Sequence, residues 1–132
     1  MDYGDLYDKG LEIRREVLGK EYVDQSIANA DDFTRDLQDF VTSTCWGAIW
    51  GRETLDRRTR SIINLSMITA LNRPHELKLH VRGALNNGLT REEIREILLH
   101  TAIYCGVPAA IDAFRNAREV LDQVDKEEGQ DS

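Results

Sequence analysis

The sequence predicts an all-α protein of about six helices. Apolar residues recur at spacings of three and four through most of the chain, as they do on the buried face of a helix. Signals for helix ends separate these segments: Pro74 suits a first turn, Gly88 and Gly106 suit helix ends, and Thr90 with Glu93 forms a capping box. No stretch reads as a strand, and no internal repeat is found.

Two helices are predicted before residue 46. Asp2 is expected to cap the first, which ends at Gly19, and residues 20–30 are predicted to be a polar connection. The second helix begins near residue 31 or 32. Its buried side is predicted from helical spacing to consist of Phe33, Leu37, Phe40, Val41 and Thr44.

A third helix is predicted from Asp56, as its cap, to about Leu71, and its apolar character on most sides favours a central, buried position. Three basic residues oppose the helix dipole in its first turn, which is unfavourable without a partner. They are Arg57, Arg58 and Arg60. Nearby carboxylates such as Glu53 and Asp56, acidic groups of another subunit, or a bound anion would each supply that partner.

Residues 46–51, with the sequence WGAIWG, combine two tryptophans with two glycines. Large aromatic side chains beside flexible backbone suit a packed turn, a pocket wall or a subunit contact, and packing is the favoured interpretation. The two cysteines, Cys45 and Cys105, lie on apolar helix faces, so we expect buried thiols rather than a disulfide.

A fourth helix, predicted to begin at Pro74, carries two adjacent stripes. The apolar stripe, which must face a core, consists of Leu77, Val81, Ala84 and Leu85. The second, at spacings of three and four, consists of Arg73, Glu76, His80, Gly83 and Asn87. It places an acid, an imidazole and a guanidinium beside the apolar stripe, which suits either a pocket or a polar structural contact. Lys78, Arg82 and Asn86 are expected to face water.

Two further helices complete the predicted fold. The inner stripe of the fifth is predicted to be Ile94, Ile97, Leu98, Thr101 and Cys105, with Tyr104 beside it. The sixth begins at Pro108 and buries Ala110, Ala113, Ala117, Val120, Leu121 and Val124, with Phe114 adding bulk.

Composition limits the possible classes of function. The 132 residues suit one domain, here residues 1–125, followed by a polar acidic tail over 126–132. The net charge of −7 and the scattered basic residues argue against nucleic-acid binding. No run of 18 apolar residues suggests a membrane span, and the N-terminus lacks signal-peptide features, so a cytoplasmic location is expected. The histidines show no metal-ligand spacing, and no metal site is predicted.

Residues 76–110, ELKLHVRGALNNGLTREEIREILLHTAIYCGVPAA, resemble the signature of the γ-carboxymuconolactone decarboxylases. The resemblance continues upstream through residues 55–61 and 46–50 and, more weakly, residues 14–19. It implies an alkylhydroperoxidase-D-like helical fold that assembles into a homo-oligomer, commonly a hexamer. The implied reaction is cofactor-independent loss of CO2 from γ-carboxymuconolactone, a dicarboxylate lactone of protocatechuate catabolism, to give β-ketoadipate enol-lactone.

The resemblance also implies a set of site residues. His80 would deliver a proton to carbon or stabilise charge on the lactone oxygen, and Glu76 would orient the ring and favour its charged form. The residues expected to bind substrate are Arg73, Arg58, Arg60, Trp46 and Tyr104. The arginines suit the carboxylates, and the two aromatic residues would wall the pocket.

Two features of the sequence bear on which reaction and which substrate the resemblance implies. Related thiol peroxidases carry Cys-x-x-Cys at the positions that Arg73 and Glu76 occupy here, so that chemistry is disfavoured. Glu53-Thr54 and Ile111 depart from the family pattern, which leaves open a substrate that is another small carboxylated lactone. A non-catalytic helical oligomer that binds a small acid is the remaining alternative.

Overall fold

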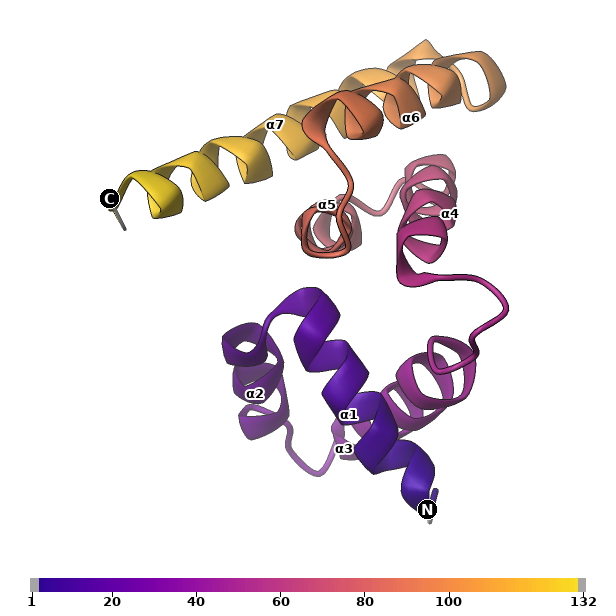
Figure 1. The fold of residues 1–132 in the computed structure, drawn as a ribbon, viewed down its shortest axis with the longest axis vertical. Helices are drawn as coiled ribbons and strands as arrows, with labels where there is room; N and C mark the ends of the chain where they lie inside the picture. The colour runs from indigo at the N-terminus through magenta and orange to yellow at the C-terminus, as the bar shows by residue number, and fades with distance from the viewer. Residues whose placement is uncertain (1–2, 131–132) are drawn as a thin grey trace. The chain divides into compact units, whose positions relative to one another are not determined.

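The computed structural model describes residues 3–130 (Figure 1). Within this range it contains seven α-helices and one π-helix and no strand, which confirms the all-α class. The predicted cap Asp2 lies outside the described residues. The chain forms two compact units, residues 1–57 and residues 58–132, which are described separately. None of the described helices has the length and apolar character that crossing a bilayer requires.

The first unit contains four helices that follow one another closely: α1 (Asp5–Leu18), α2 (Lys20–Ala28), α3 (Arg35–Phe40) and the π-helix η1 (Val41–Ile49). Helix α1 packs against η1 and α2. The buried apolar side chains are Ile13, Val17, Leu18, Val23, Trp46 and Trp50. The tryptophan rings lie with centroids 4.8 Å apart, so the packing interpretation of residues 46–51 is confirmed.

Two predictions for this unit are wrong. Residues 20–30 are mostly helical, because the fully buried Val23 and the bond from Arg15 to Asp24, 2.7 Å long, attach α2 to α1. The predicted buried face is also misplaced, since Phe33 is 93% exposed and Leu37 and Phe40 are exposed as well. The wider turn of the π-helix changes the residue spacing. The side chains buried on η1 are instead Thr42, Ser43 and Trp46, beside Gly47.

The second unit is built around α7. It contains α4 (Arg57–Leu71), α5 (Pro74–Asn86), α6 (Arg91–Tyr104) and α7 (Val107–Gln130), with α5 and α6 packed on α7. The core consists of Leu65, Leu77, Val81, Ala84, Leu89, Ile94, Leu98, Ala113, Ala117 and Val120. The predicted boundary between α5 and α6 is confirmed: Gly88 has a φ of 94°, and the Thr90–Glu93 capping box is complete.

Three expectations for the second unit need correction. Helix α4 is not buried on most sides, because only Ser61, Leu65 and Thr69 are buried within its described range. Lys78 does not face water alone but pairs with Glu119 of α7 at 2.7 Å, and Arg82 likewise pairs with Glu127 of α7. Helix α7 continues to Gln130, beyond the start of the expected tail.

Candidate functional site

The polar stripe of α5 faces α4. Asn64 Nδ2 of α4 lies 3.5 Å from Nδ1 of His80, and Asn87 Nδ2 donates a hydrogen bond of 2.9 Å to Oγ of the buried Ser61. We call these four residues the α4–α5 seam. Gly83, which is buried on the same stripe of α5, keeps the helix face narrow between His80 and Asn87.

The imidazole of His80 is half-buried, and this decides its charge. Burial lowers its pKa below the ordinary value of 6.5, while the Glu76 carboxylate one turn earlier raises it by less. Glu76 therefore acts in the expected direction, but the neutral ring is favoured. In the tautomer in which Nδ1 accepts from the Asn64 amide, the ring proton lies on Nε2 and makes that atom a hydrogen-bond donor.

The lowered pKa of His80 predicts a pH-dependent stability. The unfolded chain, with a His pKa of about 6.5, binds more protons than the folded chain as the pH falls below that value. The stabilisation is present above about pH 6.5 and is lost as the pH falls through the folded pKa. Urea unfolding followed by circular dichroism at pH 7.5 and pH 5.5 should therefore show a larger fall in unfolding free energy for the wild type than for His80→Gln. Equal falls would contradict the assignment.

The predicted arginines lie at different positions around this seam. Arg58, in the first turn of α4, pairs with Glu93, whose carboxylate also accepts the backbone N–H of Thr90 in the capping box. Arg60 is half-buried and precedes Asn64 by one turn on α4. Arg73 is exposed at the N-terminus of α5 and lines a narrow cleft of about 10 Å³. The unfavourable charge at the start of α4 is thus offset in part by structural pairing, including Arg57 with Glu16, rather than by the predicted Glu53.

Of the two predicted aromatic residues, only Tyr104 belongs to the same unit as His80. Tyr104 is 78% exposed at the end of α6, where its ring lies 5.1 Å from that of His100. Trp46 is buried in the first unit, against Trp50. Sequence reasoning missed Asn64 and Ser61. The only signal for them was their polar character in a segment, residues 61–71, whose remaining residues are apolar apart from Ser66 and Thr69.

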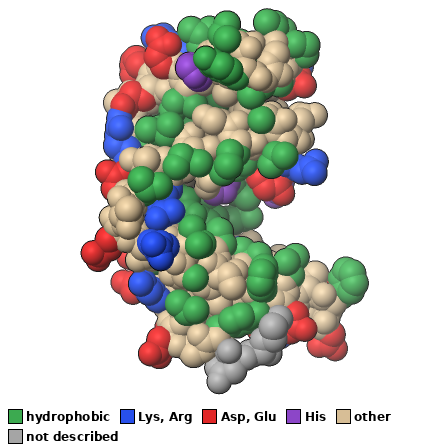
Figure 2. Space-filling model, turned by 90° about the vertical axis from the view of Figure 1, so that its right-hand side faces the viewer, with side chains coloured by type: hydrophobic (Ala, Val, Ile, Leu, Met, Phe, Trp, Pro, Cys, Tyr) green, Lys and Arg blue, Asp and Glu red, His purple; other side chains and the backbone are tan. Residues whose placement is uncertain are grey.

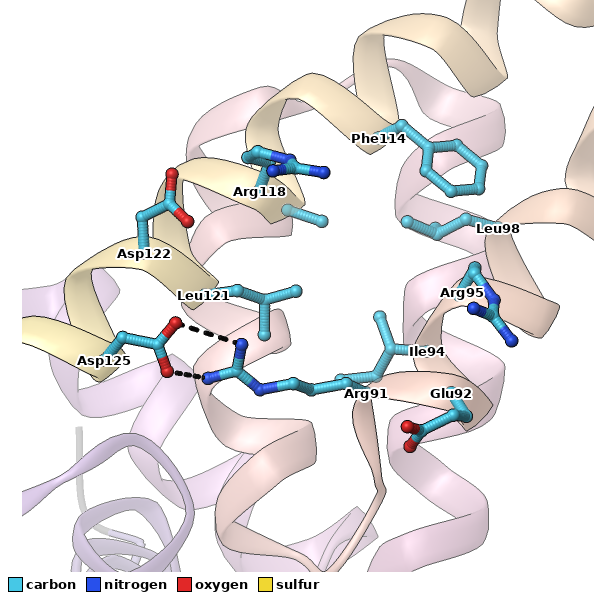
Figure 3. A pocket seen from close by; sticks show the side chains of 11 residues that line it. Arg91, Glu92, Ile94, Arg95, Leu98, Phe114, Arg118, Leu121, Asp122 and Asp125 are labelled. Atoms are coloured by element: carbon cyan, nitrogen blue, oxygen red, sulfur yellow. Dashed lines mark hydrogen bonds and ion pairs between the residues drawn. The ribbon is translucent and has the colours of Figure 1, made fainter. Parts of the chain in front are cut away.

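A pocket of about 340 Å³ lies elsewhere in the second unit, between α6 and α7 (Figure 3). Its apolar floor consists of Ile94, Leu98, Phe114, Ala117 and Leu121. Arg91 crosses one end and pairs with Asp125, and Leu98 and Phe114 lie at the other end. Arg95 of α6 and Arg118 of α7 lie on opposite sides of the pocket. None of the predicted site residues lines it. In residues 3–130, no group of three or more histidine, cysteine, aspartate or glutamate residues is placed to hold a metal ion.

The seam and the Thr90–Glu93 capping box both lie in the part of the chain that matches a known protein family. The sequence profile of the carboxymuconolactone decarboxylase family matches residues 35–119. The chain belongs to this family. The matched residues include α3 to α6 in full and the first half of α7, so both His80 and Asn64 lie inside the family domain.

Similar proteins within and around this family differ in their named activities. The chain is 46% identical over 124 residues to the nitrosuccinic acid decarboxylase of Metarhizium robertsii. This alignment covers 93% of this chain and 87% of the relative. It is 43% identical over 115 residues to the 4-carboxymuconolactone decarboxylase of Acinetobacter baylyi. This alignment covers 87% of this chain and 86% of the relative. An uncharacterized 15.0 kDa protein of Paracoccus denitrificans is 35% identical over 85 residues. This alignment covers 62% of this chain and 63% of the relative.

Proposed function

We propose that this protein is a carboxy-lyase that removes CO2 from γ-carboxymuconolactone to give β-ketoadipate enol-lactone, without a cofactor, in cytoplasmic protocatechuate catabolism. The observation that carries the proposal is the 43% identity to a 4-carboxymuconolactone decarboxylase over 87% of the chain. The half-buried, neutral imidazole of His80, held next to Asn64, gives that reaction a suitable catalytic group.

The substrate itself explains how the reaction proceeds without a cofactor. The leaving carboxylate is attached to the carbon γ to the unsaturated lactone carbonyl. When CO2 departs, the electron pair of the broken C–C bond moves through the ring double bond to the carbonyl oxygen and forms a dienolate. Protonation of the carbon next to the carbonyl then gives the enol-lactone. The protein must bind a dianion, stabilise charge on one oxygen, and allow one proton to reach carbon.

We assign His80 to the lactone oxygen. Its neutral ring with a proton on Nε2 is a fixed donor in a site of reduced water content, where a hydrogen bond to a developing oxyanion is strengthened. Glu76 limits the loss of basicity that burial causes. Arg60, Arg58 and Arg73 are the proposed carboxylate ligands, and Arg58 would exchange its Glu93 partner for substrate.

Nitrosuccinic acid is a second candidate substrate, favoured by the 46% identity to a decarboxylase of that compound. The two substrates share one chemical feature, since each is a dicarboxylate whose departing CO2 leaves electrons that the substrate itself accepts. In nitrosuccinic acid the nitro group receives the pair. The departures at Glu53-Thr54 and Ile111 are the positions at which we expect selectivity between them to be decided.

The proposal is tested by mixing the purified protein with γ-carboxymuconolactone generated enzymatically and following CO2 release and enol-lactone formation. We expect turnover far above the spontaneous rate, and a lower kcat/KM for nitrosuccinic acid. A higher kcat/KM for nitrosuccinic acid would replace the first substrate by the second. An absence of turnover with both would overturn the proposal and favour a non-catalytic protein.

We propose further that the working form is a homo-oligomer, as the resemblance implies. Several large apolar side chains are exposed where α6 ends and α7 begins, and exposed apolar patches commonly mark protein–protein contacts. They are Leu99, Ile103, Tyr104, Val107, Ile111 and Phe114. Figure 2 shows such hydrophobic side chains in patches on the surface of the chain.

Ile103→Glu should therefore shift the protein to a smaller assembly, because it buries an unpaired charge in the proposed interface. Light scattering after size-exclusion chromatography measures the mass. Gln25→Glu, which makes the same change of charge at an exposed polar position of α2, should leave the mass unchanged. A wild type that elutes as a monomer would rule out this interface.

A further inference from the structure

Arg14 is a buried cation in the first unit that the proposed reaction does not use. It lies on α1, where it is 6% exposed. Its Nη1 donates hydrogen bonds to Oε1 of Gln38 at 2.9 Å and to Oγ1 of Thr42 at 3.0 Å. Both acceptors are neutral, so these bonds orient the guanidinium without compensating its charge.

No carboxylate compensates it either, among the residues that the structure describes. The titratable groups that act on Arg14 electrostatically are two phenols and a thiol, those of Tyr7, Tyr22 and Cys45, and none of them is a carboxyl group. Burial lowers the pKa of Arg14, although a guanidinium stays charged at neutral pH, and the same burial raises the pKa of the Cys45 thiol and keeps it protonated. A buried, uncompensated charge is strongly destabilising, which calls for a reason for its presence.

The neighbouring Arg15 shows the ordinary arrangement. It binds Asp24 at 2.7 Å and is partly exposed. Two consecutive arginines of one helix thus have opposite environments, one paired at the surface and one buried among neutral groups.

The hydrogen bonds of Arg14 leave a particular edge unused. Nη1 is occupied by Gln38 and Thr42, whereas Nε is buried and makes no hydrogen bond to a described residue. The edge formed by Nε and Nη2 is one of those at which a guanidinium binds both oxygens of a carboxylate. The adjoining π-helix η1 contains a further buried group of this kind, since Oγ of Ser43 also has no hydrogen-bond partner among the described residues. Such helical segments occur frequently at functional sites.

We propose that the Nε–Nη2 edge of Arg14 binds the carboxylate of a small organic acid, with Gln38 and Thr42 fixing the orientation of the guanidinium. The bound anion supplies the charge that the fold leaves uncompensated. This site lies within the first unit and does not depend on the proposed decarboxylation, because its evidence is separate from that for His80.

The test is the melting temperature at pH 7 in increasing sodium malonate or sodium acetate, compared with sodium chloride at equal ionic strength. We expect a saturable rise with the carboxylates that chloride does not give. Arg14→Met should abolish this difference, while the matched control Arg15→Met, which removes a neighbouring positive charge, should keep it.

Arg14→Lys is the second variant, because it keeps the charge but loses the two-donor edge. It should need at least 10-fold more carboxylate for the half-maximal effect, and broadening of the 13C-acetate signal in NMR titrations should weaken in parallel. Retention of the full carboxylate response in Arg14→Lys or Arg14→Met would overturn the proposal. So would a wild type whose response to the carboxylates equals its response to chloride.

Discussion

Replacing His80 by alanine is expected to lower kcat/KM for γ-carboxymuconolactone by about 10²- to 10³-fold, the usual loss when one donor to a developing oxyanion is removed. The ring is half-buried, and its Nδ1 faces the Asn64 amide, so a substrate oxygen would meet a fixed donor rather than mobile water. The measurement is initial-rate kinetics at pH 7.5. The melting temperature should be recorded alongside, to separate lost chemistry from lost folding.

His75→Ala is the matched control for this variant. His75 lies in the first turn of the same helix and is exposed. Its loss removes an imidazole without touching the seam, so kcat/KM should stay within twofold of the wild type. Equal losses in His75→Ala and His80→Ala, or full activity in His80→Ala, would remove the seam from the mechanism.

Replacing Gly10 by alanine should destabilise the first unit by about 3 kcal/mol, the upper part of the usual range for overpacking. Gly10 is buried where α1 meets η1, and an added Cβ would fall on the carbonyl oxygen of Thr42 and within 2.8 Å of the backbone nitrogen of Gly47. Backbone cannot move aside as a flexible side chain can. This clash outweighs the roughly 1 kcal/mol that alanine gains over glycine in a helix.

The measurement is urea unfolding followed by tryptophan fluorescence, because both tryptophans of the chain, Trp46 and Trp50, lie in this unit. Gly129→Ala provides the control. It is also a helical glycine, but a Cβ there meets nothing within 4 Å, so the same substitution should be neutral or slightly stabilising. An unchanged transition in Gly10→Ala would mean that α1 and η1 are not packed as closely as described.

Signals confined to a few neighbouring residues allowed parts of the fold to be predicted from sequence. The Thr90–Glu93 capping box and the position of Pro74 each depend on contacts within one turn, and both were identified correctly. Helix α2 was missed because Val23 and Ile27 give only a weak apolar stripe, and because its stability comes from burial against α1. Phe33 was misplaced because it lies in the turn before α3, so helical spacing does not apply to it.

Only the α5 residues of the candidate site could be predicted from the sequence. His80 and Glu76 share a helix face, and their relation follows from spacing alone. Asn64, sixteen residues from His80, becomes its neighbour only through the packing of α4 on α5. Nothing local distinguishes Arg14 from Arg15 either, although one is buried and the other pairs at the surface.

The pH dependence of kcat/KM between pH 4.5 and pH 8.5 tests most directly whether the neutral imidazole of His80 acts on the substrate. Because burial lowers the pKa of this ring below 6.5, kcat/KM should be constant above pH 6.5 and fall at more acidic pH as the ring becomes protonated. His80→Gln should lack this acidic limb. A wild-type kcat/KM that instead falls as the pH rises through 6 would show that the charged ring is the active form and would contradict the account.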